Sequence, residues 1–300
     1  METRQKHIGR LFALFTITVW GSTFISSKKL LAIYTPAQIM LTRFLLAYCA
    51  LWLLRPRRLA LTRKQEAVFF LMGLTGCSVY FYTENTALTY TLASNVSIIV
   101  AAAPILTAIL AHFTGEERFH RGTLWGFLTA FSGVVLVVCN GTFVLKLNPR
   151  GDLLALAAAA CWAVYSILLR RMGQGLDPVL VTRRTLFWGA VTAIPLAVLG
   201  GAPFPAAPLL TPVVAGNFLF LGLIGSGLCY VLWNKAFRLL GVVATNNFIY
   251  LNPFVTIVTA KLFLNEPISP LALLGAALIT LGVVISQRPA KQETEKSCAG

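Results

Sequence analysis

Ionisable side chains inside long apolar stretches are the first places to look for chemistry in this sequence. Glu84 is the only carboxylate well inside such a stretch, and Arg43 lies in the stretch before it. An ionisable group at the centre of a bilayer costs at least about 2.5 kcal/mol, so each is a functional candidate by default. Two interpretations of Glu84 stand side by side: a role in proton or substrate coupling, or a structural ion pair with Arg43.

Arg183 and Arg184 form a second charged feature, in an apolar stretch with no intramembrane acid at their depth. One interpretation is that both side chains reach the cytoplasmic headgroup region while their apolar stems stay in the hydrocarbon layer. The other is that the pair attracts an anionic or carboxylate-bearing substrate.

Polar and aromatic side chains recur at helical spacing in the same stretches. Tyr80 and Glu84 are four residues apart, as are Tyr230 and Asn234, so each pair shares one helix face. We expect such groups to face other helices or a wet cavity, and hydrogen bonding between helices is the alternative to substrate contact. The candidate substrate-binding residues are Trp20, Ser22, Tyr80, Glu84, Asn95, Trp162, Tyr165, Tyr230, Asn234, Asn246, Tyr250 and Asn252.

Pro104 and Pro253 lie in the middle of two apolar stretches. Each removes a backbone hydrogen bond and favours a kink, which is either a packing kink or a hinge for gating. Glu117 and Glu266 lie at the ends of stretches, where helix capping or loop anchoring is expected. The six Cys and three His have neither disulfide nor metal-site spacing, so no metal and no cofactor are expected.

The elements that carry these residues are apolar segments long enough to cross a bilayer. The chain is 57% hydrophobic and only 12% charged, whereas a soluble domain carries about 25% charged residues. A spanning helix needs roughly 20 apolar residues, and ten segments meet that length. They are 11–33, 36–54, 67–90, 92–113, 122–139, 152–171, 179–199, 213–238, 243–264 and 270–287. The expected fold is therefore an all-α integral membrane protein with ten transmembrane helices.

The basic residues predict the orientation of these helices. The net charge is +15, but Lys and Arg cluster in short loops between apolar segments, which argues against nucleic-acid binding. With a cytoplasmic N-terminus, seventeen basic residues lie on the inner side and five on the outer side. Because cytoplasmic loops are enriched in Lys and Arg, both termini are expected in the cytoplasm. The expected location is the plasma membrane, which the chain crosses several times. Residues 1–10 and 288–300 are then cytoplasmic tails.

An internal repeat relates the two halves, residues 11–139 and 152–287. A shift of 149 residues places Pro104 on Pro253, Glu117 on Glu266 and Gly133 on Gly282, and a shift of 142 places Trp20 on Trp162. Each half holds five segments, an odd number, so the second half must enter the membrane from the opposite side. Inverted repeats of this kind are typical of secondary transporters, which bind substrate near the midplane between the repeats.

The ordered motifs of both halves resemble the EamA family of the drug/metabolite transporter superfamily, over about residues 11–287. In the first half the resemblance rests on Trp20-Gly21-Ser22-Thr23-Phe24, Arg43-Phe44, Asn85-Thr86-Ala87-Leu88, Ala103-Pro104-Ile105, Gly115-Glu116-Glu117-Arg118 and Gly133-Val134. In the second half it rests on Asn234-Lys235-Ala236, Leu251-Asn252-Pro253, Leu264-Asn265-Glu266-Pro267 and Gly282-Val283. The resemblance implies ten helices, cytoplasmic termini, and export or import of small metabolites.

The expected function is a secondary transporter that moves small organic metabolites by alternating access. A lining of aromatic and uncharged polar groups with one acid suits an amino-acid-like or related amphipathic solute, and Arg184 favours efflux. Protons are a possible coupling ion, and the oligomeric state is open. A membrane-embedded enzyme acting on lipids and a structural membrane protein are the alternatives, and no P-loop motif for an ATP-driven pump is present.

Overall fold

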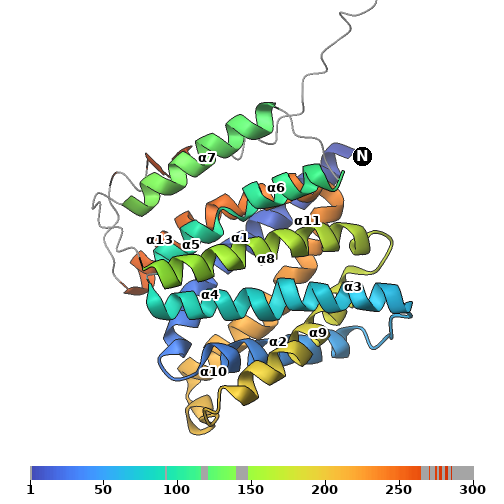
Figure 1. Cartoon of the computed structure of the whole chain (residues 1–300), viewed down its shortest axis with the longest axis vertical. Coiled ribbons are helices and arrows are strands. Elements are labelled where there is room, and N and C mark those ends of the chain that lie inside the picture. Colours follow the sequence, from blue (N-terminus) through green and yellow to red (C-terminus); the bar gives the residue numbers. More distant parts are fainter. Residues whose placement is uncertain are drawn as a thin grey trace, which may run out of the picture.

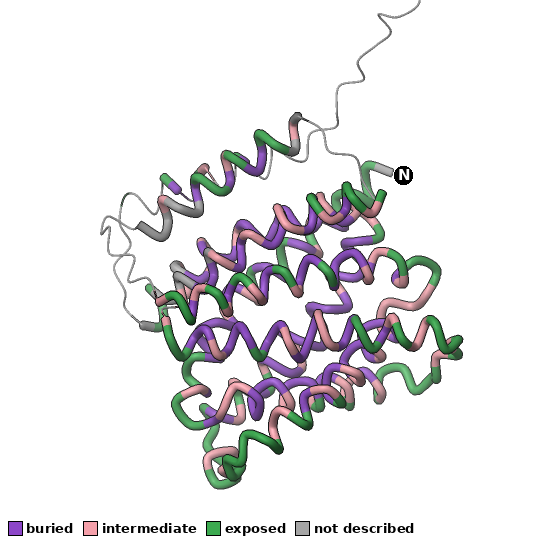
Figure 2. Tube along the Cα trace, in the orientation of Figure 1, coloured by how far each residue is buried: buried purple, intermediate pink, exposed green. Residues whose placement is uncertain are grey.

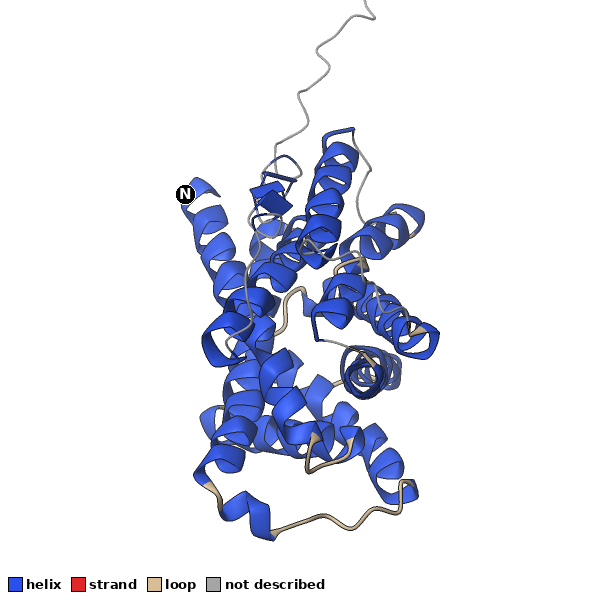
Figure 3. Cartoon of the chain, turned by 90° about the vertical axis from the view of Figure 1, so that its left-hand side faces the viewer, coloured by secondary structure: helices blue, strands red, loops and turns tan. Residues whose placement is uncertain are grey.

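The computed structural model describes residues 2–91, 93–115, 121–139 and 148–264, together with isolated positions between 270 and 285. Helices joined by short connections make up these residues, and no strand occurs among them (Figure 3). Within this part, four continuous helices are long and apolar enough to cross a membrane: Thr3–Leu31, Pro36–Leu54, Pro149–Gly173 and Pro212–Leu240. The predicted all-α class is therefore confirmed for the described residues.

The first half begins with α1 (Glu2–Leu31) and α2 (Pro36–Leu54). A continuous rod follows, made of α3 (Arg63–Gly73), the π-helical turn η1 (Leu74–Ser78) and α4 (Val79–Tyr90). The next span consists of α5 (Ala93–Val100) and α6 (Ala103–Phe113), and α7 covers Arg121–Cys139.

The second half begins with α8 (Pro149–Gly173) and α9 (Pro178–Leu199). After a short 3-10 turn, η2 (Ala207–Leu210), a second rod combines α10 (Pro212–Leu219), the π-helical η3 (Phe220–Leu228) and α11 (Cys229–Leu240). The last described span consists of α12 (Val242–Asn246), the 3-10 helix η4 (Asn247–Leu251) and α13 (Asn252–Leu264). The predicted helix 270–287 lies mostly outside the described residues, as do Glu117 and Glu266.

Local sequence signals explain where several helices begin. Thr35 and Thr62 each accept a hydrogen bond from the backbone N–H three residues on, and the glutamine there bonds back to the threonine N–H. These reciprocal bonds satisfy amide groups that have no partner inside the helix. Asn148 caps α8 by accepting from the Gly151 N–H, and Asp177 caps α9 by accepting from the Val179 N–H. Two predicted starts were late, because α1 begins at Glu2 and α3 at Arg63 rather than at residues 11 and 67.

Packing interleaves the two halves. α1 packs against α11 and α13 of the second half, α8 packs against α4 and α6 of the first half, and α2 packs against α9 (Figure 1). Figure 2 shows that buried residues concentrate on these central helices, while exposed residues lie along the outer faces and the connections. The first helix of each half is thus held by the third and fourth spans of the other half.

The interruptions in the spans lie at matching places in the two halves. A shift of 149 residues carries η1, residues 74–78, onto 223–227 inside η3. The same shift carries Ala103, where α6 begins, onto Asn252, where α13 begins. The spans predicted as continuous helices over 92–113 and 243–264 are therefore both broken, by a turn at residues 101–102 and by η4.

Candidate functional site

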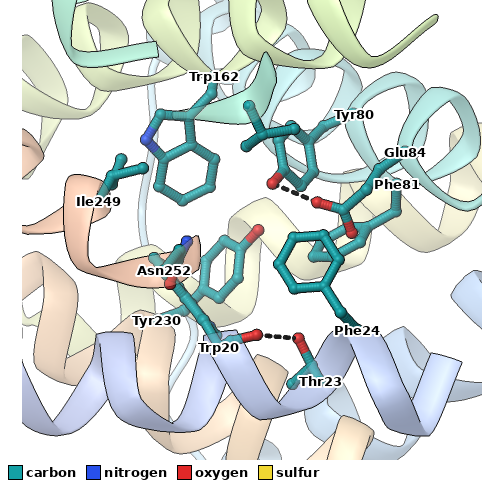
Figure 4. A pocket seen from close by; sticks show the side chains of 11 residues that line it. Trp20, Thr23, Phe24, Tyr80, Phe81, Glu84, Trp162, Tyr230, Ile249 and Asn252 are labelled. Carbon is teal, nitrogen blue, oxygen red and sulfur yellow. Dashed lines mark hydrogen bonds between the residues drawn. The ribbon is translucent and has the colours of Figure 1, made fainter. Parts of the chain in front are cut away.

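A central cavity lies between α1, α4, α5, α8, α11, η4 and α13. Its lining consists of Trp20, Thr23, Phe24, Tyr80, Phe81, Glu84, Val100, Trp162, Tyr230, Ile249 and Asn252. In Figure 4 these side chains converge on one space from both halves of the chain. The free volume of the cavity is about 20 Å³, which is room for one or two water molecules. The cavity is therefore closed around its lining in this conformation.

Aromatic rings form most of the wall. The rings of Trp20 and Trp162 are 5.2 Å apart and nearly perpendicular, at 88°. Tyr80 lies 5.3 Å from Trp162, and Tyr230 lies 5.6 Å from Trp20. Edge-to-face and tilted pairs at these distances add about 0.5–1.5 kcal/mol each beyond area burial. The rings present apolar surface that suits the hydrocarbon part of a solute.

The polar groups of the cavity are few. Tyr80 Oη donates to Glu84 Oε2 at 2.5 Å, and Thr23 Oγ1 donates to the Trp20 carbonyl at 2.6 Å (Figure 4). Asn252 Oδ1 is buried and accepts no hydrogen bond in the described part of the chain. Glu84 is thus the one acid of the lining, held by a tyrosine on its own helix. A solute in the cavity would meet one carboxylate and one free amide oxygen.

The two π-helical turns hold two of the aromatic side chains. Trp20 Nε1 donates to the Gly225 carbonyl at 2.9 Å, and Tyr230 Oη donates to the Gly76 carbonyl at 2.6 Å. Gly76 lies in η1 and Gly225 in η3. A π-helical turn shifts the backbone bonding from i→i+4 to i→i+5, and such turns are frequent at functional sites. Each half therefore fixes an aromatic residue that comes from the other half.

Arg43 is buried beside the cavity rather than in it. Its Nε donates to Ser226 Oγ at 2.8 Å, and its guanidinium lies 4.0 Å from the centre of the Phe81 ring. Although both residues lie in the described part of the chain, no ion pair joins Arg43 and Glu84. The predicted direct pair is therefore not formed in this conformation, because Glu84 turns to Tyr80 and Arg43 turns to η3.

Arg183 holds the connection between α2 and α3, and Arg184 holds the first turn of α3. Arg183 donates to the carbonyl groups of Arg55 and Arg57, and Arg184 forms an ion pair with Glu66. Arg184 also lies 4.6 Å from the centre of the Phe187 ring. The expectation that the pair has no acid at its depth was wrong, because the sequence-based segment began one residue after Glu66. Neither arginine lines the central cavity.

Six of the twelve candidate substrate-binding residues line the central cavity. They are Trp20, Tyr80, Glu84, Trp162, Tyr230 and Asn252. The sequence-based set did not include Thr23, Phe24, Phe81, Val100 and Ile249. Thr23 and Phe24 lie three and four residues after Trp20 in the same helix, so they share its face. That spacing could have predicted that they line the cavity too.

The other candidates lie elsewhere. Asn246 is behind the wall, where its Oδ1 accepts from Trp162 Nε1 at 2.9 Å. Tyr165 packs behind Trp162 and Tyr230, at 5.2 and 6.0 Å between ring centres.

Tyr250 packs against Phe127 of α7, with ring centres 6.1 Å apart. Ser22 lines a separate groove with Lys29, between α1, α10 and α13. Asn234 lines a third pocket, at the end of α8 and α11. The side chain of Asn95 lies outside the described residues.

Pro104 and Pro253 begin helices rather than kink them. Pro104 is the second residue of α6, and Pro253 is the second residue of α13. The first turn of a helix has no internal partner for its N–H groups, so proline costs nothing there. The predicted mid-helix kinks are therefore breaks between two shorter helices. No group of three or more His, Cys, Asp or Glu residues that could hold a metal ion occurs in the ranges that the structure describes.

Known proteins resemble the chain over nearly its whole length. It is 28% identical to the uncharacterized transporter YyaM of Bacillus subtilis, over 93% of this chain and 94% of that protein. It is also 28% identical to a probable terminal-alkyne amino-acid exporter of Streptantibioticus cattleyicolor, over 96% of each chain. A chain in a solved crystal structure superposes with a TM-score of 0.75 at 19% identity, covering 95% of this chain and 96% of that one. That likeness shows a shared fold.

The EamA-like transporter family model matches residues 7–139 and again residues 149–287. The two matches cover most of the chain and identify a multi-pass membrane transporter rather than an enzyme, with a small molecule as its substrate. The chain therefore belongs to the EamA-like transporter family, within the drug/metabolite transporter superfamily.

Proposed function

We infer that the protein is a secondary transporter that exports small amphipathic solutes, amino acids or close relatives, by alternating access through the central cavity. The observation that carries this proposal is the composition of the cavity wall. Trp20, Trp162 and Tyr230 supply aromatic surface, and Glu84 and Asn252 supply hydrogen-bonding groups. An apolar pocket with a few convergent polar groups is the usual form of a small-molecule site.

Ten spans arranged as two inverted five-helix repeats, residues 11–139 and 152–287, account for the packing. In such a repeat the first helix of one half is equivalent to the first helix of the other. The swapped contacts of α1 with α11 and α13, and of α8 with α4 and α6, support that equivalence. We place the chain in the plasma membrane with both termini in the cytoplasm. The orientation is supported by the excess of basic residues in the loops on the same side of the membrane as the N-terminus.

Transport requires the cavity to widen, since it has room for only one or two water molecules. The breaks between α5 and α6 and within residues 247–251 are the places where the backbone can bend without losing a regular helix. Pro104 and Pro253, the second residues after these breaks, fix the start of the following helix. We place the hinges there.

Glu84 is the group that we assign to proton coupling. It is buried, it lines the cavity, and its charge has no ion-pair partner among the described residues. Glu84 is also the one carboxyl that a solute in the cavity would meet. Binding of a solute and binding of a proton at Glu84 would then be linked.

An amino-acid-like substrate has support from one relative, the probable terminal-alkyne amino-acid exporter. The cavity is consistent with that class because it combines apolar rings with a single acid rather than a cluster of cations. A polyanion such as a sugar nucleotide would need several cationic partners, and none of the lining residues is basic.

A flux experiment tests the proposal. The full-length protein is placed in liposomes, and uptake is measured for a panel of amino acids, amines and organic acids with and without an imposed proton gradient. We expect at least one amino acid to be carried, with a rate that depends on the gradient. Flux of none of the solutes would overturn the proposal, and flux of polyanions alone would overturn the substrate class.

A further inference from the structure

The pocket that Asn234 lines opens at the end of the bundle where the N-terminus lies. It is formed by the last turns of α8 and α11 and by the connection between α8 and α9, and we call it the vestibule. Its lining consists of Leu169, Arg170, Gly173, Gln174, Gly175, Asn234, Phe237 and Arg238. Its free volume is about 380 Å³, compared with about 20 Å³ for the central cavity. The vestibule is open while the cavity is closed.

One face of α11 connects the vestibule to the central cavity. Tyr230 lines the cavity, Asn234 forms the floor of the vestibule, and Arg238 lies at its mouth. These residues are four apart, so they share a face and successive ones are about 6 Å apart along the axis. A solute that leaves the vestibule along this face would reach the cavity wall within one helical turn.

The mouth of the vestibule is positively charged. Arg170 and Arg238 both line it, and neither forms an ion pair with another residue in the described ranges. Asp177, whose charge reaches Arg238, is already paired with Arg55 at 3.1 Å. The two guanidinium groups therefore remain available to a carboxylate, which they can bind through paired N–H donors.

The floor of the vestibule has an unused acceptor. Asn234 Nδ2 donates to Thr182 Oγ1 of α9 at 2.7 Å, whereas Asn234 Oδ1 has no partner among the described residues. Asn234 is only 3% exposed, so this oxygen is shielded from bulk water. A buried acceptor without a donor is costly, and a donor from a ligand would remove that cost.

We propose that the vestibule is a loading site for α-amino carboxylates, a role that rests on the proposed export function. Arg170 and Arg238 bind the carboxylate, and Asn234 Oδ1 accepts from the ammonium group. Leu169 and Phe237 form the apolar walls against which the solute's side chain packs. Residues four apart on a helix have Cβ atoms about 5–6 Å apart, a gap that the neighbouring carboxylate and ammonium of one amino acid can bridge.

Cysteine labelling tests the charge of the vestibule directly. Gln174 is exposed and lines the mouth, so Gln174→Cys reports on it. In the purified full-length protein, an anionic sulfonatoethyl methanethiosulfonate should label the new thiol several-fold faster than its cationic trimethylammonium counterpart. Adding Arg238→Gln should remove most of that preference, and Arg238→Lys should keep it.

Two controls make the labelling specific. The chain without the new cysteine gives the labelling of the native thiols. Lys235→Gln is the matched control, since Lys235 lies on α11 but outside the vestibule, over the Phe12 ring. Equal rates for the two reagents, or an equal effect of Lys235→Gln and Arg238→Gln, would overturn the proposal.

Protection by ligands tests the class of solute. Each proteinogenic amino acid is added separately, and at least one should slow labelling of Gln174→Cys, while its amide, which lacks the carboxylate, should not. Protection by anionic phospholipid alone would contradict the proposal. If amino acids are transported but none protects, the loading site is wrong and the proposed function stands. If an amino acid protects but no solute is transported, the site stands and the proposed function fails.

Discussion

Gly76 and Gly225 hold equivalent places in the two π-helical turns, and each carbonyl accepts a hydrogen bond from an aromatic side chain of the opposite half. Tyr230 donates to Gly76 at 2.6 Å and Trp20 donates to Gly225 at 2.9 Å. The two glycines also pack against α8 and α1, since a Cβ atom at Gly76 would meet the Tyr165 ring and one at Gly225 would meet Thr23. The cavity wall is thus built by reciprocal contacts between the halves.

Replacement of Gly76 by alanine should destabilise the protein. The new Cβ atom would lie 2.3 Å from Tyr165 Cδ2, and Tyr165 is itself fully buried, so the ring cannot easily move away. Overpacking of this kind costs about 1–3 kcal/mol. We expect Gly76→Ala to lower the midpoint of thermal unfolding in detergent. Gly216→Ala, where no atom lies within 4 Å of the new Cβ, is the control and should not lower that midpoint.

Asn246 should act through Trp162. Because Asn246 Oδ1 accepts from Trp162 Nε1, Asn246→Ala frees the indole ring without removing any atom from the cavity wall. Loss of one hydrogen bond costs about 0.5–1.5 kcal/mol, or roughly threefold to tenfold in affinity. We expect Asn246→Ala and Trp162→Phe each to weaken transport of the identified substrate.

The two effects should be less than additive, since each variant removes one partner of the same bond, while Trp162→Phe also removes part of the cavity wall. Transport kinetics of the two single variants and the double variant give this comparison. Thr18→Ala, which removes a bond on an exposed face of α1, is the control. Additive losses would show that Asn246 acts on the substrate by another route.

The sequence predicted the all-helical class and six of the eleven residues that line the cavity. Apolar segments of spanning length must close their backbone hydrogen bonds internally, which only helices and closed barrels do in lipid. Trp20, Trp162 and Glu84 stood out because aromatic repetition and a lone buried acid are rare in such segments. These signals depend only on residue types and their spacing along the chain, so they are visible without a structure.

The features that the sequence did not predict depend on contacts between distant segments. In the π-helical turns, Gly76 packs against Tyr165 and Gly225 packs against Thr23. No local sequence pattern identifies these partners. Asn234 was grouped with the cavity because its spacing from Tyr230 resembles that of Glu84 from Tyr80. One turn of α11 instead carries it about 6 Å further, into the vestibule.

Neutralising Glu84 should uncouple transport from the proton gradient. Glu84→Gln removes the titratable group but keeps an oxygen that can accept from Tyr80 Oη. We therefore expect near-normal expression, together with flux that no longer responds to an imposed gradient. Asp152→Asn, at the first turn of α8, is the control and should keep the native response. A gradient response that survives in Glu84→Gln would exclude Glu84 as the proton carrier.

The orientation can be tested at two exposed positions on opposite sides of the bundle. Arg58 lies in the connection between α2 and α3, and Ala206 lies in the connection between α9 and α10. With cytoplasmic termini, an impermeant thiol reagent added to intact cells should label Ala206→Cys and should label Arg58→Cys only after the cells are opened. The native chain gives the background. Labelling of Arg58→Cys in intact cells would reverse the arrangement.

Substrate flux through a variant of the cavity wall tests the central claim most directly. Trp20 contacts Trp162, Tyr230 and Trp233 and lines the cavity, whereas Trp125 of α7 is 63% exposed and serves as a matched tryptophan outside it. Uptake of the amino acid that the native protein carries best is measured in liposomes that contain equal amounts of native protein, Trp20→Ala or Trp125→Ala. Solute transport through the central cavity predicts a loss of at least tenfold for Trp20→Ala, on the order of 1.4 kcal/mol, and native flux for Trp125→Ala. Native flux in Trp20→Ala, with the variant folded and inserted, would contradict it.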